Sequence, residues 1–207
     1  MNVRVFHCGY IAENCYVVEN DDTAVIIDPG FYNDDLSDWI LNNKNKVAGI
    51  LLTHLHFDHI TFLSETESMT NAPIYIHAVD NEHIFESEYN LSHNNGRAYD
   101  IKKPAKMPIS VIDNEEIIIG SLKFRVLHTP GHTAGSCCYL CGNSLFSGDT
   151  LFYGSYGRTD FLSGSSSDLK NSLMRLFKLD GKIKVYPGHG PTTDIAYERV
   201  NNPIFES

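Results

Sequence analysis

One pattern constrains the fold of this chain more than any other: a short, largely apolar, β-branched run that passes directly into Gly, Pro, Asp or His. Apolar runs bounded by turn residues are typical of strands buried in a sheet. Each run therefore predicts a strand that presents a polar side chain at its end. The runs lie at 24–27, 47–52, 124–127, 144–147 and 183–186.

Helical patterns lie between these strands. The clearest covers 166–177, where leucines recur at helical spacing behind a Ser-Ser-Asp start signal, and shorter patterns predict helices over about 34–43 and 60–69. The residues up to about 52 and those at about 109–146 are rich in strands at hairpin spacing. This mixture favours an α+β fold of two packed β-sheets with helices on their outer faces, four layers in all.

Length and composition predict a single domain. The 207 residues, 42% hydrophobic, are enough to bury one sizeable core, and no repeat or linker divides them, so we take residues 1–207 as one domain. The polar stretch 90–108 predicts a long surface loop. The 26 acidic against 16 basic residues give a net charge of −10, which disfavours nucleic acid as a partner.

The sequence also predicts a cytoplasmic location. No apolar run approaches the roughly 20 residues that cross a bilayer, and the first residues carry no signal-peptide pattern, so we expect no membrane partner. The five cysteines, an odd number, fit a reducing compartment better than a disulfide framework. Cys138 and Cys141 have redox or zinc spacing, but without a second such pair small buried hydrophobes explain them better. The oligomeric state stays open.

The densest chemical signal follows the run 47–52. There His54, His56, Asp58 and His59 fall within six residues. Imidazole and carboxylate groups are the ligands that zinc and similar metals take in proteins. In extended backbone His54 and His56 point to one side, whereas Asp58 and His59 can turn toward a neighbouring position. The cluster therefore permits two adjacent metal sites.

Three further donors stand at the ends of other predicted strands. His132 and His189 each follow a Pro-Gly pair, and Asp149 follows a glycine. Glycine lets the backbone approach a metal closely, and proline fixes the direction of entry. Because such a cation takes three or four protein ligands, the first cluster needs donors from elsewhere to fill two sites. Seven donors can be divided between two metal positions, with three at each position and one shared by both.

The ordered motifs HxHxDH, PGHT, SGD and PGHG resemble those of the metallo-β-lactamase-fold hydrolases over nearly the whole chain. Within that superfamily, the segments 148–152 and 157–161 resemble the small glyoxalase II-like (hydroxyacylglutathione hydrolase-like) proteins and the related persulfide dioxygenases. The resemblance implies a four-layer αββα sandwich of two mixed β-sheets with the site at one edge. It also implies one metal held by His54, His56 and His132, a second held by Asp58, His59 and His189, and Asp149 as a bridge between them.

Several other residues have two readings. Asp28 ends a buried strand and could hydrogen-bond a ligand imidazole, as that position does in the family, or simply begin a turn. Arg158 could anchor a substrate carboxylate or pair with Asp160. Tyr153 could line the pocket or serve packing. For His128 we favour a structural or supporting role. From the 18 residues that follow His189, we expect no helical C-terminal domain of the kind with which full-length glyoxalase II enzymes grip glutathione, so the substrate stays open.

These ligands predict a metal-dependent hydrolase with two divalent cations, Zn in the first instance, with Fe or Mn as alternatives. Such metals lower the pKa of a bound water to about 7, so a metal-bridging hydroxide is the expected nucleophile. Asp58 would orient it and accept its proton. A thioester, an S-acyl conjugate of a small thiol, is the expected substrate, because a thiol pKa near 8.5 makes the thiolate leave with little acid help.

Two alternatives come from other classes. One is a mononuclear-iron persulfide dioxygenase that uses His54, His132 and Asp149 as a facial triad. The other is a non-catalytic metal-binding scaffold, which the sequence disfavours because a structural zinc site is closed by four donors and gains nothing from seven.

Overall fold

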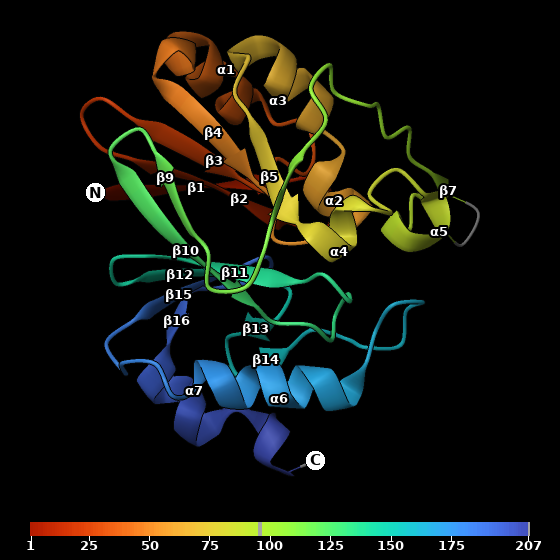
Figure 1. Ribbon diagram of the computed structural model, residues 1–207, viewed down its shortest axis with the longest axis vertical. Coiled ribbons are helices and arrows are strands. Elements are labelled where there is room, and N and C mark those ends of the chain that lie inside the picture. The colour runs from red at the N-terminus through yellow and green to blue at the C-terminus, as the bar shows by residue number, and fades with distance from the viewer. Residues whose placement is uncertain (95–96, 207) are drawn as a thin grey trace.

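Two six-stranded β-sheets lie face to face in the computed structural model, which describes residues 1–94 and 97–206 (Figure 1). In the first sheet β1 to β3 run antiparallel and β3, β4, β5 and β8 run parallel. In the order of the sheet the strands are β1 (Asn2–Cys8), β2 (Glu13–Glu19), β3 (Ala24–Ile27), β4 (Val47–Leu51), β5 (Ile74–His77) and β8 (Ile109–Val111).

The second sheet is also mixed. Its strands β9 to β12 are antiparallel, β12 pairs β15 in parallel and β15 pairs β16 antiparallel. In the order of the sheet they are β16 (Thr193–Asp194), β15 (Lys184–Pro187), β12 (Ser144–Gly148), β11 (Cys137–Cys141), β10 (Leu122–His128) and β9 (Glu116–Ile119). Two short ladders pair β6 (His93–Asn94) with β7 (Arg97–Ala98) and β13 (Leu151–Phe152) with β14 (Ser155–Tyr156).

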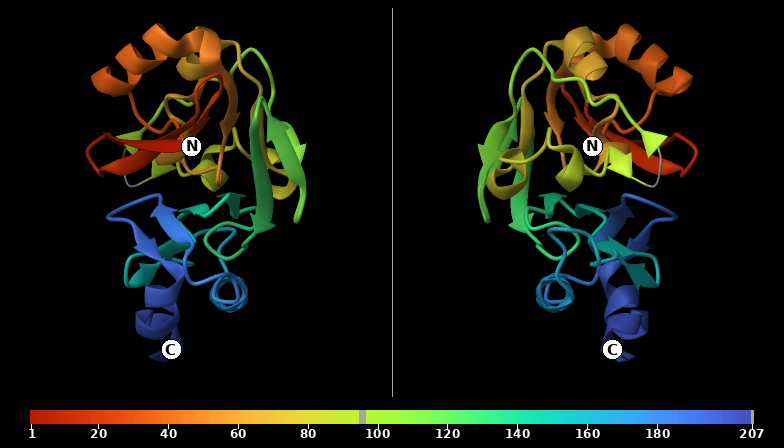
Figure 2. Two further views of the ribbon diagram at one scale, coloured as in Figure 1. Left: turned by 90° about the vertical axis from the view of Figure 1, so that its left-hand side faces the viewer. Right: turned by 90° about the vertical axis from the view of Figure 1, so that its right-hand side faces the viewer.

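Helices cover both outer faces, as Figure 2 shows from two sides. Two of them, α1 and α3, lie over the first sheet, and α6 and α7 lie over the second. The helices are α1 (Asp34–Asn43), α2 (Phe57–Ile60), α3 (Leu63–Thr70), α4 (Ala78–Asn81), α5 (Ser87–Asn90), α6 (Ser166–Leu176) and α7 (Ile195–Asn201), with 3₁₀ turns at Lys44–Lys46 and Pro203–Glu206. The predicted four-layer αββα sandwich is confirmed.

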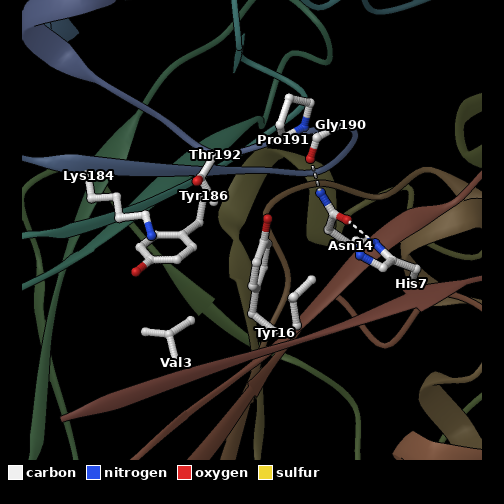
Figure 3. A pocket seen from close by; sticks show the side chains of 10 residues that line it. Val3, His7, Asn14, Tyr16, Lys184, Tyr186, Gly190, Pro191 and Thr192 are labelled. Carbon is white, nitrogen blue, oxygen red and sulfur yellow. Dashed lines mark hydrogen bonds between the residues drawn. The ribbon is translucent and has the colours of Figure 1, made fainter.

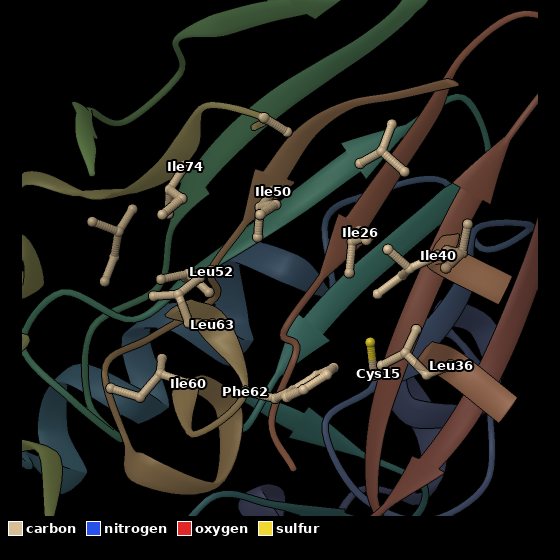
Figure 4. Packing of buried hydrophobic residues seen from close by; sticks show 14 of the residues in the cluster. Cys15, Ile26, Leu36, Ile40, Ile50, Leu52, Ile60, Phe62, Leu63 and Ile74 are labelled. Carbon is tan, nitrogen blue, oxygen red and sulfur yellow. The ribbon is translucent and has the colours of Figure 1, made fainter. Parts of the chain in front are cut away.

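The period of two along each strand produces three apolar layers. On β3, Ile26 faces α1 and α3, whereas Val25 and Ile27 face the second sheet (Figure 4). On β12, Phe146 faces the first sheet and Leu145 faces α6. Because these strands are buried on both faces, their sequences read as continuous apolar runs.

The helices match their predicted ranges except in one place. The structure splits the helix expected over 60–69 into α2, which ends at Ile60, and α3, which begins at Leu63. The break lies at Phe62, whose backbone N–H donates to the carbonyl of Gly30, 2.6 Å away, instead of to its own helix. This bond ties the start of α3 to the loop that follows β3.

The stretch 90–108 carries little regular structure beyond β6 and β7, and residues 95–96 within it lie outside the described part of the chain. Among the helices that the structure describes, none is long and apolar enough to cross a membrane.

Candidate metal centre

The structure brings all seven predicted donors together, at the edge where β4, β10, β12 and β15 end. They form three overlapping groups, within each of which the candidate ligand atoms lie within 4.8 Å of one another. The groups are His54, His56 and His132; His54, His59 and Asp149; and Asp58, His59 and His189. Segments up to 135 residues apart in sequence therefore meet at one point, because the ends of several strands in both sheets reach the same edge.

Asp149 lies between two sets of candidate ligands, or triads: one is His54, His56 and His132, and the other is Asp58, His59 and His189. Its Oδ1 is 3.4 Å from Nε2 of His59, and its Oδ2 is 3.6 Å from Nε2 of His132 and 3.7 Å from Nε2 of His189. One carboxylate thus faces donors of both sets with different oxygens, which is the arrangement that a bridging ligand requires.

The centre is closed on one side and open on the other. His54, His56, Asp58, His59 and His132 are buried. The side chains of Asp149, Asp58 and His189 are 11%, 12% and 25% exposed, so His189 has the largest exposed fraction of the three. A molecule from solvent therefore reaches the cluster past His189.

Asp28 holds the first cluster from behind. Its carboxylate accepts the backbone N–H of Thr53 at 2.8 Å and the Thr53 hydroxyl at 2.7 Å, and Nδ1 of His59 donates to it at 3.1 Å. Since the Thr53 hydrogen points to Asp28, its oxygen accepts from Nδ1 of His54, 3.0 Å away. Both imidazoles therefore have their protons on Nδ1, and their Nε2 lone pairs face the centre.

His132 is fixed in the same way. Its Nδ1 donates to the carbonyl oxygen of Arg158 at 2.8 Å, so its Nε2 lone pair also faces inward. There it meets Nδ1 of His56 at 2.9 Å.

The His189 turn is held by the first sheet. Both amide hydrogens of Asn14 are used on this turn, one donated to the carbonyl of Pro187 at 3.0 Å and one to that of Gly190 at 2.9 Å (Figure 3). The hydroxyl of Tyr16 donates to the Pro187 carbonyl as well, at 2.7 Å. The turn that carries the last candidate ligand is thus fixed against β2.

The electrostatics suit a cation. Burial, reinforced by the neighbouring imidazoles, lowers the pKa of His54 and of His56 well below the usual range, so both are neutral and can donate lone pairs. Burial alone would also lower the pKa of His59, but Asp58 and Asp149 outweigh it and raise that pKa. Burial likewise opposes ionisation of Asp149, but His59 and the other imidazoles hold its pKa well below the usual value.

Three buried atoms test whether the residues fit a metal. Within the described residues, Nε2 of His54, Nε2 of His59 and Oδ1 of Asp149 have no hydrogen-bond partner. Buried polar groups are almost always satisfied, so such orphans indicate a missing ion or ligand. The donor set of imidazoles and carboxylates therefore fits divalent metals of the zinc and iron type.

The two predicted substrate contacts lie differently. The guanidinium of Arg158 pairs with both carboxylate oxygens of Asp160, at 2.7 and 2.6 Å, and lies 4.3 Å over the ring of Phe161. Tyr153 is half exposed and stacks on Tyr197 of α7.

The rings that face the centre are ones that the sequence did not single out. Phe161 lies 5.3 Å from the ring of His56, and Phe152 lies 6.3 Å from that of His189, measured between ring centroids. Their position follows from the segment 148–161, which folds over the cluster, and no periodicity in the sequence marks them.

Three polar residues behind the cluster were also missed. Asn14, Asp80 and Glu13 are all buried. Glu13 lies 3.9 Å from Nδ1 of His59, and burial raises the pKa of its carboxyl group well above the usual value. A polar residue inside or just after an apolar run is the only signal that the sequence gives for them.

The remaining candidates keep structural roles. His128 stacks on His77 with ring centroids 3.9 Å apart, and its Nε2 donates to the Ala134 carbonyl at 2.9 Å, which supports the loop of His132. All five cysteines are free and buried, as small hydrophobes would be.

An αββα sandwich with a cluster of five histidines and two aspartates at its edge defines a class of metal-dependent hydrolases. Residues 9–189 match the model of the metallo-beta-lactamase superfamily, and the chain belongs to that family. It is 34% identical to the probable metallo-hydrolase YqgX of Bacillus subtilis (strain 168), over 99% of this chain and 97% of the relative.

Two solved structures show the same relationship. The BLEG-1 B3 metallo-beta-lactamase is 35% identical, with a TM-score of 0.90 over 100% of both chains. TTHA1623, solved in a di-iron-bound form, is 34% identical, with a TM-score of 0.85 over 97% of this chain and 98% of that one.

Proposed function

We propose that this protein is a binuclear metal-dependent hydrolase of thioesters, glyoxalase II-like in its chemistry. The observation that carries the proposal is the pair of triads around Asp149, whose oxygens face both. A structural zinc site is closed by four donors, whereas this cluster has seven and opens to solvent at one side.

We assign His54, His56 and His132 to one metal, Asp58, His59 and His189 to the other, and Asp149 to both. When bound, two divalent cations lower the pKa of a water to about 7 and polarise a substrate carbonyl. Zinc is the cation that we expect, with iron or manganese as alternatives.

Asp58 is the proposed proton acceptor. Its Oδ2 lies 3.2 Å from Nε2 of His189 at the open side of the centre. Burial opposes its ionisation, but His59 and the hydrogen bond from His189 lower its pKa, so the carboxylate is ionised and can accept a proton from the attacking water. The thiolate leaves without a general acid, because a thiol pKa is near 8.5.

The thioester assignment rests on the segment 148–161, which resembles the glyoxalase II-like proteins. This segment borders the centre, because the backbone carbonyl of Arg158 accepts a hydrogen bond from His132 and the ring of Phe161 lies beside that of His56. We propose that Arg158 can exchange its bond to Asp160 for a substrate carboxylate and that Tyr153 lies along the outer rim of the same pocket.

A second candidate is the persulfide dioxygenase with one iron on His54, His132 and Asp149. The observation that bears on it is that TTHA1623, which is 34% identical, was solved in a di-iron-bound form, so a related centre can hold iron, although with two ions and not one. Iron at one per chain together with oxygen uptake would favour this reading. Zinc near two per chain, with thiol release that needs no oxygen, favours the hydrolase.

The test combines metal analysis with a substrate panel. The freshly purified full chain is assayed for bound metals and for turnover of S-acyl thiols, lactones, phosphodiesters, a persulfide and, because one relative is described as a metallo-beta-lactamase, a β-lactam. His56→Ala and Asp149→Ala should abolish turnover and lower bound metal. His83→Ala, which removes a histidine outside the centre that pairs with Glu86 and stacks on Tyr89, is the matched control and should change neither.

Full thioester turnover after loss of metal would contradict the mechanism. A metal-loaded protein that is inert toward the whole panel would favour the scaffold instead.

A further inference from the structure

Asp80 is a buried acid on α4 that lies outside the set of seven donors. Its side chain has three hydrogen bonds, and the residue is only 1% exposed. Oδ2 accepts the backbone N–H of Leu55 at 3.1 Å and the hydroxyl of Thr133 at 2.8 Å, and Oδ1 accepts the backbone N–H of Gly135 at 2.7 Å. A carboxylate so deeply buried is tolerable only because all of these donors face it.

These three partners belong to two ligand-bearing segments. Leu55 stands between His54 and His56 in the segment after β4 of the first sheet. Thr133 directly follows His132 in the segment after β10 of the second sheet. One carboxylate therefore ties together the two segments that supply the all-histidine triad, across the boundary between the sheets.

The contact is tight as well as polar. A Cβ atom on Gly135 would lie 2.4 Å from Oδ1 of Asp80 and equally close to its backbone nitrogen. The loop that carries His132 is thus pressed directly onto α4, which lies beside α2 in Figure 1. A shift of Asp80 would be transmitted to that loop, because no space separates them.

The other triad is supported by different residues. Asn14 fixes the turn of His189 through its bonds to Pro187 and Gly190, of which Figure 3 shows the second. Asp28 accepts from His59. Asp28 also reaches Thr53 and through it His54, so its support is shared. Asp80 contacts residues that stand beside His54, His56 and His132, in a segment that also continues to Asp58 and His59, whereas Asn14 contacts the residues on either side of His189.

We propose that Asp80 is the positioning residue of the metal position formed by His54, His56 and His132, and that it sets the affinity of this position independently of the other one. The inference rests on the two-metal centre proposed above. Loss of a residue that orients metal ligands typically costs 10- to 100-fold in metal affinity.

The experiment measures zinc affinity with buffered Zn²⁺ on the full chain. Asp80→Ala should weaken one of two bound zinc ions by about 10- to 100-fold and leave the other within about threefold. Asn14→Ala is the matched variant, and it should weaken the opposite ion. Double variants assign each effect to a metal position. In a His189→Ala chain, which keeps the position of His54, His56 and His132, Asp80→Ala should still weaken the binding of the remaining zinc. In a His56→Ala chain, which keeps the other position, Asp80→Ala should leave the binding of the remaining zinc unchanged.

Asp80→Asn tests whether the hydrogen bonds of Asp80, and not only its volume, hold the ligand segments in place. The amide keeps the size of the side chain but has one acceptor oxygen, so it can serve either Leu55 and Thr133 or Gly135 and leaves the rest unpaired. It should give an intermediate loss of affinity and an altered Co²⁺ absorption spectrum. If Asp80→Ala does not fold, Asp80→Asn and Thr133→Val, which removes a single hydrogen bond, carry the same test.

Equal weakening of both ions by Asp80→Ala, or of neither, would overturn the inference while leaving the proposed hydrolase intact. Wild-type affinity in Asp80→Asn would do the same. A wild-type chain that binds no zinc or other divalent metal would overturn the proposed centre and this inference together.

Discussion

Replacing Gly188 with alanine adds one methyl group at the back of the metal centre. The new Cβ would lie 2.2 Å from Oδ1 of Asp149 and 2.7 Å from Cε1 of His59. The backbone of Gly188 is not in the left-handed region, so alanine itself is not strained there. The whole effect of the substitution therefore falls on two candidate ligands.

The size of the effect follows from the distances. An unstrained contact needs roughly 3.4 Å, so Oδ1 of Asp149 must retreat by about 1 Å. A misplacement of about 1 Å in a catalytic group can cost about 100-fold in rate. The carboxylate is the end of a side chain and can rotate away, but the buried ring of His59 must also shift, so we expect the free energy of unfolding of the metal-free protein to fall by about 1–3 kcal/mol.

The assay compares Gly188→Ala with Gly190→Ala on the other side of His189. A Cβ on Gly190 would meet nothing within 4 Å, but its φ of +77° strains alanine, at a cost of roughly 1 kcal/mol. We expect Gly188→Ala to lose about 100-fold in thioester turnover and to bind metal more weakly, and Gly190→Ala to lose only stability. Normal metal content and turnover in Gly188→Ala would refute the geometry of the centre.

Three further predictions follow from the same structure. Burial lowers the pKa of His77 to about 4, so below about pH 6.5 the unfolded chain binds a proton that the folded chain does not. As the pH falls from about 6.5 to about 4, the free energy of unfolding of the wild type, measured in urea, should therefore fall by up to roughly 3 kcal/mol relative to that of His77→Gln, an upper bound because water screens the charge. Parallel curves of this free energy against pH for the two proteins would contradict the prediction. Removal of metal by a chelator should lower the melting temperature by about 5–10 °C, since metal at 100 times its Kd contributes about 2.7 kcal/mol, and an unchanged melting temperature would argue against bound metal. Arg158→Ala should raise KM about tenfold for a thioester that carries a carboxylate and leave kcat and a neutral thioester unaffected, whereas an unchanged KM would limit Arg158 to its pair with Asp160.

The sequence was most informative where local pattern and chemistry coincide. Each apolar run became a strand near its predicted bounds, because burial on both faces of a strand selects apolar residues without interruption. His54 and Asp149 were recognisable as candidate ligands because a histidine or acid placed directly after such a run has no role in the apolar layers. The αββα layering followed from the family resemblance, since periodicity alone does not say which sheet faces which.

What the sequence could not show are the partners that distant segments provide. The break between α2 and α3 depends on a bond from Phe62 to Gly30, which no helical propensity encodes. Asn14 looked like an ordinary polar residue at the start of a strand, yet its amide reaches a turn more than 170 residues away in sequence. Such contacts exist only once both sheets are packed, so they are read from coordinates and not from spacing.

The buried side chains that hold the ligand segments also explain how seven candidate ligands can stay close together without a metal. Asp58 and Asp149 repel each other as long as no cation lies beside them, whereas Nδ1 of His56 and Nε2 of His132, 2.9 Å apart, share a hydrogen bond. Flexible loops would relieve that repulsion by moving apart. Here Asp80 and Asn14, two buried side chains anchored on other elements, hold the ligand segments in place, so the folded chain keeps the donors close before any metal arrives. We therefore expect Asp80→Ala and Asn14→Ala each to weaken metal binding and to lower the free energy of unfolding of the metal-free chain, which zinc titration and urea unfolding would measure.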